Sequence, residues 1–183
     1  PKAHHGKFRS GFSYAIDVPA AQVPYLLEVD YPDDDRRTVN VIILEGAEKS
    51  GGLQYPGAQL GSGYETGDAY ELTRSMQTHR VLFWPSQTKL RCALVSMNPG
   101  MRAAAARIRV YRLGDIPTAP AGQPDGRVMA SWNEEPGRWT AYFRTFQPEL
   151  GDLERNLVGM QRWCQMARYA GFNTINPTEA VYQ

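Results

Sequence analysis

The chain has 183 residues, of which 42% are hydrophobic and 21% charged, and its formal net charge is +1. This composition is ordinary for a globular protein, and so small a charge gives no basic field for nucleic acid or acidic lipid. No apolar run reaches the roughly 18 residues of a membrane-spanning helix. We therefore expect no nucleic-acid partner and no membrane insertion. The length allows one good-sized core, or one domain and part of another.

Alternating apolar and polar residues predict a series of short strands in the first part of the chain. Residues 1–11 carry little pattern, and residues 12–17 form the first alternating segment. The stretch 25–31 has the period of two that marks a half-buried strand, and Pro32 with three following aspartates ends it. A partner strand, 38–44, follows at hairpin distance.

A long segment rich in glycine, residues 45–63, is predicted to be a loop and a candidate functional loop. Short strand pieces follow around the Gly67-Asp68 turn, and clearer strands come after them. The alanine run 103–106 is too short for a helix and is predicted to lead into a strand. The expected later strand segments are 64–67, 69–72, 76–84, 89–97 and 107–113. Seven to nine such strands indicate a mainly β, antiparallel sandwich or barrel.

The pattern changes after residue 113. Three prolines among small residues in 114–126 are typical of a linker. An apolar segment, 139–146, precedes a helical repeat, and a short apolar strand, 172–175, follows it. Gly171 stands where a helix would be capped. We predict a β-sandwich domain over 1–113, a junction over 114–138 and a strand–helix–strand segment over 139–183. The apolar face of the predicted helix consists of Leu153, Leu157, Met160, Cys164 and Ala167.

Both cysteines, Cys92 and Cys164, lie in segments predicted to be buried. A disulfide requires the two segments to pack together, so the cysteines leave the compartment open. The chain shows no signal peptide and does not begin with Met. We expect a piece of a longer secreted bacterial protein with an extracellular or periplasmic location.

The acidic run Asp33, Asp34 and Asp35 is a candidate calcium site, because hard cations prefer several carboxylate oxygens. The spacing differs from that of an EF-hand loop, and a solvated turn is the alternative. No His, Asp and Glu residues have the spacing of a transition-metal site, and no other cofactor is expected.

Aromatic residues give the better indication of a ligand. Sugar rings stack their apolar faces on Trp and Tyr, while polar neighbours bind the hydroxyl groups. The alternative is that Trp84 and Tyr70 belong to the core. The candidate ligand-binding residues are Tyr55, Tyr64, Glu65, Asp68, Tyr70, Arg80 and Trp84, with Asn40 as a further polar contact.

Two parts of the chain resemble known families. Tyr25-Leu-Leu-Glu-Val-Asp-Tyr-Pro, Phe83-Trp-Pro and Arg107-Ile-Arg-Val-Tyr-Arg make residues 12–113 similar to a galactose-binding-like jelly roll. Such modules often carry a structural calcium, which the resemblance extends to the acidic run. Residues 139–176, through the run Arg162 to Asn173, resemble the approach to a glycoside-hydrolase barrel. A whole barrel needs roughly 250 residues, so the resemblance implies its opening elements only.

Three hypotheses follow. The chain is a non-catalytic carbohydrate-binding or architectural module beside a catalytic domain, and on this reading it is not itself an enzyme. Alternatively, it is the first part of a glycoside hydrolase, with Asn176 and Glu179 lining the active site. The third is a structural or adhesion domain without a small ligand.

Overall fold

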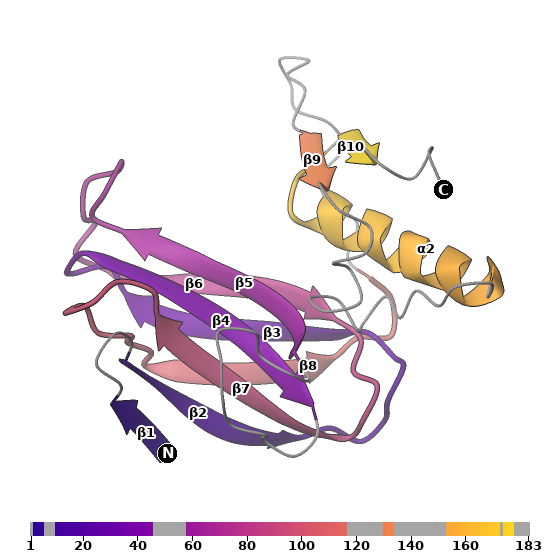
Figure 1. The fold of residues 1–183 in the computed structure, drawn as a ribbon, viewed down its shortest axis with the longest axis horizontal. Coiled ribbons are helices and arrows are strands. Elements are labelled where there is room, and N and C mark those ends of the chain that lie inside the picture. Colours follow the sequence, from indigo (N-terminus) through magenta and orange to yellow (C-terminus); the bar gives the residue numbers. More distant parts are fainter. Residues whose placement is uncertain are drawn as a thin grey trace. The chain divides into compact units, whose positions relative to one another are not determined.

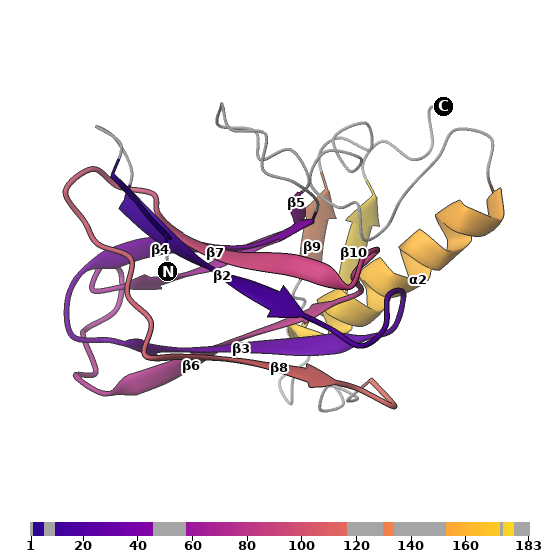
Figure 2. The same ribbon diagram turned by 90° about the horizontal axis from the view of Figure 1, so that it is seen from below.

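The computed structural model describes residues 2–5, 10–45, 58–116, 130–133, 153–172 and 174–177. The chain divides into two compact units, Pro1–Leu113 and Gly114–Gln183. The first is a sandwich of two antiparallel sheets, which confirms the predicted mainly β fold (Figures 1 and 2). Its strands are β1 (Lys2–His5), β2 (Ser10–Asp17), β3 (Tyr25–Pro32), β4 (Arg37–Glu45), β5 (Ala58–Thr66), β6 (Met76–Phe83), β7 (Lys89–Ser96) and β8 (Arg107–Arg112).

The larger sheet has five strands in the order β1-β2-β7-β4-β5, and the smaller has three in the order β6-β3-β8. Strand β3 is thus central in its sheet, but β4 lies in the other one, so the predicted hairpin between 25–31 and 38–44 is wrong. Pro32 has no N–H to continue the ladder. Beyond it, the Asp33 N–H donates to the Ser75 carbonyl and the Arg74 N–H to the Asp33 carbonyl. These bonds fix a corner at which the chain changes sheets.

The core lies between the sheets and follows the alternation seen in the sequence. Leu27 and Val29 of β3 and Val41 and Ile43 of β4 face inward, and each is at most 1% exposed. Burial of such a side chain contributes about 1.5–3 kcal/mol. The period of two therefore identified the inward faces of β3 and β4 correctly.

The second half of the predicted loop 45–63 is a strand. β5 pairs antiparallel with β4 from Thr66 back to Ala58, so its glycines lie within a sheet. Gly63 is needed there because a β carbon would overlap the Val39 carbonyl oxygen. The predicted strand piece 69–72 is irregular instead, and β1 was not predicted.

The second unit contains β9 (Ala130–Asn133), α2 (Leu153–Tyr169) and β10 (Thr174–Pro177). β9 and β10 pair in parallel and α2 lies between them in sequence, as in a βαβ unit. The partner of the predicted last strand therefore comes from residues assigned to the junction, and the predicted strand 139–146 lies outside the described residues. No described helix is long and apolar enough to cross a membrane.

Helix α2 ends as expected but buries a different face. Gly171 has a φ of 92°, and the Phe172 N–H donates to the Ala167 carbonyl at 3.0 Å, as in a glycine-capped helix end. Trp163 and Ala167 are buried, whereas Leu157 is 54% exposed and Cys164 is also exposed. The predicted apolar face of the helix is therefore wrong at Leu157 and Cys164. The buried face instead contains Trp163 and Ala167, which lie one helical turn apart. Cys92 and Cys164 are both free thiols.

Candidate functional site: the outer face of the three-stranded sheet

A row of charged side chains crosses the outer face of the three-stranded sheet. Since Leu27 and Val29 point into the core, Glu28 and Asp30 between them point outward. The register places Arg80 of β6 and Arg109 of β8 opposite Glu28, one on each side. Cross-strand neighbours on one face are close enough for opposite charges to pair.

Arg109 joins the two carboxylates of β3. Its Nη1 lies 2.6 Å from Asp30 Oδ2 and its Nη2 2.8 Å from Asp30 Oδ1, a bidentate pair. Its Nε donates to Glu28 Oε2 at 3.0 Å. Arg80 Nε donates to Glu28 Oε1 at 2.8 Å, and Thr78 Oγ1 to Asp30 Oδ1 at 2.8 Å. Bidentate guanidinium–carboxylate pairs fix both partners in one plane, so this face is preorganised.

The hydrogen bonds favour the ionised forms of Glu28, Asp30 and Arg109. The bond from Arg80, and then that from Arg109, lowers the pKa of Glu28 against the opposing effect of burial. The bonds from Arg109 and Thr78 lower the pKa of Asp30. The hydrogen bonds that Arg109 donates, to Asp30 first and then to Glu28, raise the pKa of Arg109 itself. Perturbed groups gathered on one surface are a recognised indicator of a functional site.

An exposed aromatic ring completes the face. Tyr111 lies two residues beyond Arg109 on β8, therefore on the same side of the sheet, and is 44% exposed. The Arg80 side chain is 53% exposed, whereas that of Glu28 is only 13% exposed. The face thus combines fixed carboxylate acceptors, guanidinium donors and an apolar ring surface. These groups can bind a ligand that carries hydroxyl groups on an apolar ring.

Among the predicted ligand-binding residues that the structure describes, Arg80 alone belongs to this face. Tyr64 and Trp84 are 6% and 4% exposed, which does not fit the expectation that they present rings to a ligand. Tyr64 stacks on Tyr31 with the ring centroids 3.8 Å apart, and its hydroxyl donates to the Ala104 carbonyl. Burial raises the pKa of Tyr64. Both rings therefore belong to the core.

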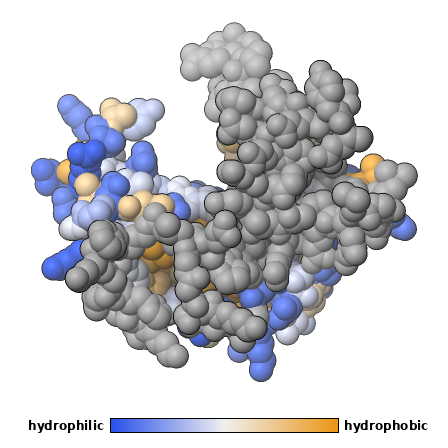
Figure 3. Space-filling view, in the orientation of Figure 1, coloured by the Kyte–Doolittle hydropathy of each residue, from blue (hydrophilic) through white to orange (hydrophobic). Residues whose placement is uncertain are grey.

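Asp68 and Tyr70 lie in the loop between β5 and β6, at the hydrophilic end of the sandwich (Figure 3). Tyr70 is 85% exposed, and Asp68 pairs with Arg36 at 3.0 Å. Glu65 is exposed on β5 just before this loop. The loop is a second surface with an exposed ring. Both side chains of its ion pair, Arg36 and Asp68, are more than half exposed. Tyr55 lies outside the described residues.

The acidic run after β3 does not converge on a common point. Asp33 accepts hydrogen bonds from the Thr73 N–H at 2.9 Å and the Thr73 hydroxyl at 2.7 Å, and these bonds lower its pKa. Asp34 pairs with Arg37, while the Asp35 carboxylate accepts the Arg36 N–H. Within the described ranges, no three His, Cys, Asp or Glu side chains form a group that could hold a metal ion. The run fixes the corner between the sheets and the loop before β6.

Glu28, Asp30, Arg109 and Tyr111 were not among the residues predicted from the sequence. The available signal was the spacing: Glu28-x-Asp30 in one strand and Arg107-x-Arg109 in another carry opposite charges at alternate positions. That pattern predicts neighbouring strands with a shared charged face. The partner strands are about 80 residues apart in sequence, so the pattern becomes evident only when the sheet order is known.

No family model matches the chain, and no curated protein matches it. Among solved structures, a family 35 carbohydrate-binding module from an environmental isolate aligns with 58% of this chain and 69% of its own. The identity is 15% and the TM-score 0.42.

Proposed function

We propose that the sandwich is a non-catalytic carbohydrate-binding module whose ligand lies on the outer face of β6, β3 and β8. The observation that carries the proposal is the array in which Arg109 holds Asp30 and Glu28 beside the exposed ring of Tyr111. Sugar recognition needs both parts: a ring face for the apolar side of the sugar and planar polar groups for its hydroxyls.

The paired charges of the face favour hydroxyl groups over ions as ligands of the array. Two guanidinium groups, Arg80 and Arg109, meet two carboxylates, Glu28 and Asp30, and these four charges cancel, while Arg107, opposite Asp30 in the register, adds one positive charge on the same side of β8. An anionic ligand would have to displace a carboxylate that is already bound in a bidentate pair, and a cationic ligand would have to displace a guanidinium. Hydroxyl groups can instead use the remaining lone pairs and N–H groups without breaking the array.

Binding to a panel of neutral and uronic-acid polysaccharides, measured by affinity electrophoresis and then by titration calorimetry, tests the proposal. We expect a neutral glycan to bind and Tyr111→Ala to weaken it about tenfold or more, since a tenfold loss is about 1.4 kcal/mol. Tyr70→Ala is the matched control, because it removes an exposed tyrosine from a different surface. Loss of binding in Tyr70→Ala alone would move the site to the loop before β6. Absence of any glycan binding would refute the proposed function.

For the second unit, we propose the opening elements of a (β/α)-barrel in a longer glycan-active protein. The parallel pairing of β9 with β10, with α2 between them in sequence, supports this. Asn176 lies in β10, whereas Glu179 falls outside the described residues. Hydrolysis assays of the longer protein with Glu179→Gln test the barrel hypothesis, and unchanged activity would remove Glu179 from the mechanism. A structural calcium and an extracellular or periplasmic location stay predictions of the sequence. Comparing the unfolding midpoint in calcium with that in EDTA tests the calcium prediction.

A further inference from the structure

Strand β8 forms one edge of the three-stranded sheet, because among the described strands it pairs with β3 alone. The larger sheet continues further on this side of the sandwich, since β2 faces β8 across a cavity and β1 pairs with β2 beyond it. An edge strand carries a row of backbone N–H and C=O groups that can pair with another strand. The edge at β8 is therefore a place where one more strand can be added to the smaller sheet.

The register shows which backbone groups of β8 face away from β3. The Leu113 N–H donates to the Pro24 carbonyl at 2.9 Å, and these two residues continue the register of β8 with β3. Because hydrogen-bonded pairs alternate along an antiparallel ladder, every second residue before Leu113 also bonds to β3. The residues between them turn their N–H and C=O groups to the edge, and within the strand these are Ile108, Val110 and Arg112.

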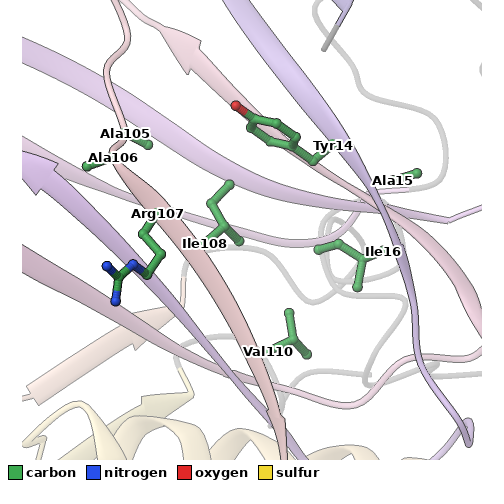
Figure 4. A pocket seen from close by; sticks show the side chains of 8 residues that line it. All are labelled: Tyr14, Ala15, Ile16, Ala105, Ala106, Arg107, Ile108 and Val110. Atoms are coloured by element: carbon green, nitrogen blue, oxygen red, sulfur yellow. The ribbon is translucent and has the colours of Figure 1, made fainter.

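The side chains of β8 alternate between charged and apolar along this edge. Figure 4 shows the Arg107 guanidinium on the opposite side of the strand from Ile108 and Val110. Asp30 lies opposite Arg107, but both of its oxygens are already bound by Arg109, so Arg107 retains an exposed charge. On the inner side, Ile108 and Val110 are only half-buried. A strand added at this edge would therefore meet a positive charge on its outer side and apolar side chains on its inner side.

Strand β3 shows what kind of strand β8 accepts. Its Glu28 and Asp30 meet the outer arginines of β8, while its Leu27 and Val29 lie opposite the inner apolar residues. Both edges of a strand present the same side chains to their neighbours, so the free edge selects the same alternation of acidic and apolar residues. A second β8 does not offer this alternation. Three of its six residues are arginines, and like charges that lie opposite each other destabilise a pair of strands.

We propose that the free edge of β8 binds an extended peptide segment of a partner protein, one that alternates acidic and apolar residues, as an additional antiparallel strand. The backbone groups of Ile108, Val110 and Arg112 provide the hydrogen bonds, and Arg107 selects acidic over basic side chains. In this mode of recognition the main-chain bonds give affinity and the alternate side chains give specificity. The proposal does not depend on carbohydrate binding, since a sugar would use side chains of the outer face and the peptide uses the backbone edge.

Fluorescence anisotropy with labelled peptides and the whole chain provides the test. The probe is a peptide with the sequence of residues 25–31, which has the required alternation. One control peptide carries Glu28→Lys and Asp30→Lys, and another is N-methylated at alternate residues. We expect the lysine peptide to bind about two- to fivefold more weakly, as for an exposed charge pair. The N-methylated peptide should not bind, because it lacks the main-chain donors. Arg107→Glu should reverse the preference between the acidic and lysine peptides, whereas Arg102→Glu, at another exposed arginine, should keep it.

Amide hydrogen exchange locates the bound peptide on β8. With the acidic peptide, the N–H groups of Ile108, Val110 and Arg112 should exchange about tenfold or more slowly, since hydrogen-bonded amides exchange only after local opening. The N–H groups of Arg107 and Arg109, which already bond to β3, should keep their rates. Absence of peptide binding, equal affinity for the N-methylated peptide, or unchanged exchange at the three edge residues would overturn the proposal. A dimer of the chain that excludes the peptide, detected by sedimentation equilibrium, would overturn it in favour of a second copy.

Discussion

Asp30 shows how one residue makes the charged face sensitive to pH. Its pKa is lowered by Arg109 and then by Thr78, so the folded state holds the carboxylate ionised more strongly than the unfolded chain does. A depressed folded pKa gives stability that is complete above the ordinary aspartate value of 3.8 and is lost as the pH falls through the lower folded value. Wild type should therefore lose more stability than Asp30→Asn between pH 6 and pH 3.

Urea unfolding at the two pH values measures this difference as a shift in midpoint. Asp115→Asn, which changes an exposed aspartate outside the strands, serves as the control and should behave as wild type. Equal midpoint shifts for Asp30→Asn and wild type would show that the Arg109 pair does not stabilise the fold in solution.

His79 also makes the stability depend on pH, but in this case burial in the folded state disfavours the protonated form. Its Nε2 lies 2.9 Å from Ser62 Oγ, its ring is near that of Tyr64, and burial lowers its pKa. The unfolded chain therefore binds a proton near pH 6.5 before the folded protein does, and stability falls as the pH drops below 6.5. His79→Gln should flatten the unfolding midpoint between pH 7.5 and pH 5. An unchanged slope in the variant would contradict the assignment of this pH dependence to His79.

At the scale of the element, the sequence predicts where strands form but not which strands pair with each other. The alternation in 25–31 and 38–44 is a local property of the chain, so both strands and their inward faces follow from it. Their placement in different sheets depends on the corner at Asp33, which is held by Thr73, about 40 residues away. The charged face shows the same limit, because Glu28 meets Arg109 across 81 residues.

The first part of strand β5, residues 58–63, was missed because its glycines imitate a loop. Gly61 and Gly63 lie opposite Ile42 and Asn40 in the sheet, where the strand approaches β4 without side chains. The expectation for Tyr64 has the same origin: next to a supposed loop its ring suggests a ligand contact, whereas within the full strand β5 it points into the core. The error in the site therefore derives from the error in the element.

Gly63→Ala tests whether this close approach holds β5 in place. The added β carbon would meet the Val39 carbonyl oxygen, a backbone atom that cannot move aside without disturbing β4. We expect a loss of about 1–3 kcal/mol in the free energy of unfolding, as for other overpacked sites. Gly114→Ala is the control, since its β carbon would meet no atom within 4 Å. A Gly63→Ala protein as stable as Gly114→Ala would contradict the pairing of β5 with β4.

At the scale of the whole molecule, the sandwich has what an independent domain needs. Its two sheets enclose a core that includes Trp84, and its last residue, Leu113, donates its N–H to the Pro24 carbonyl at 2.9 Å. At the other end of the unit, β1 pairs with β2 in the larger sheet, so both ends are fixed by backbone hydrogen bonds. The strand pairings and the buried residues described for this core lie within residues 10–113, so we expect the unit to fold without α2, β9 or β10.

A chain ending at Leu113 should consequently fold alone in one cooperative transition. Trp84 is then its sole tryptophan, and at 4% exposure its emission reports the core. Urea unfolding followed by Trp84 fluorescence and by circular dichroism should give coincident curves, the sign of a two-state domain. Separate curves, or a tryptophan emission already at the solvent-exposed wavelength in buffer, would mean that residues after 113 complete the core. In that case the charged face would have to be studied in the whole chain, because it is built on strands of this unit.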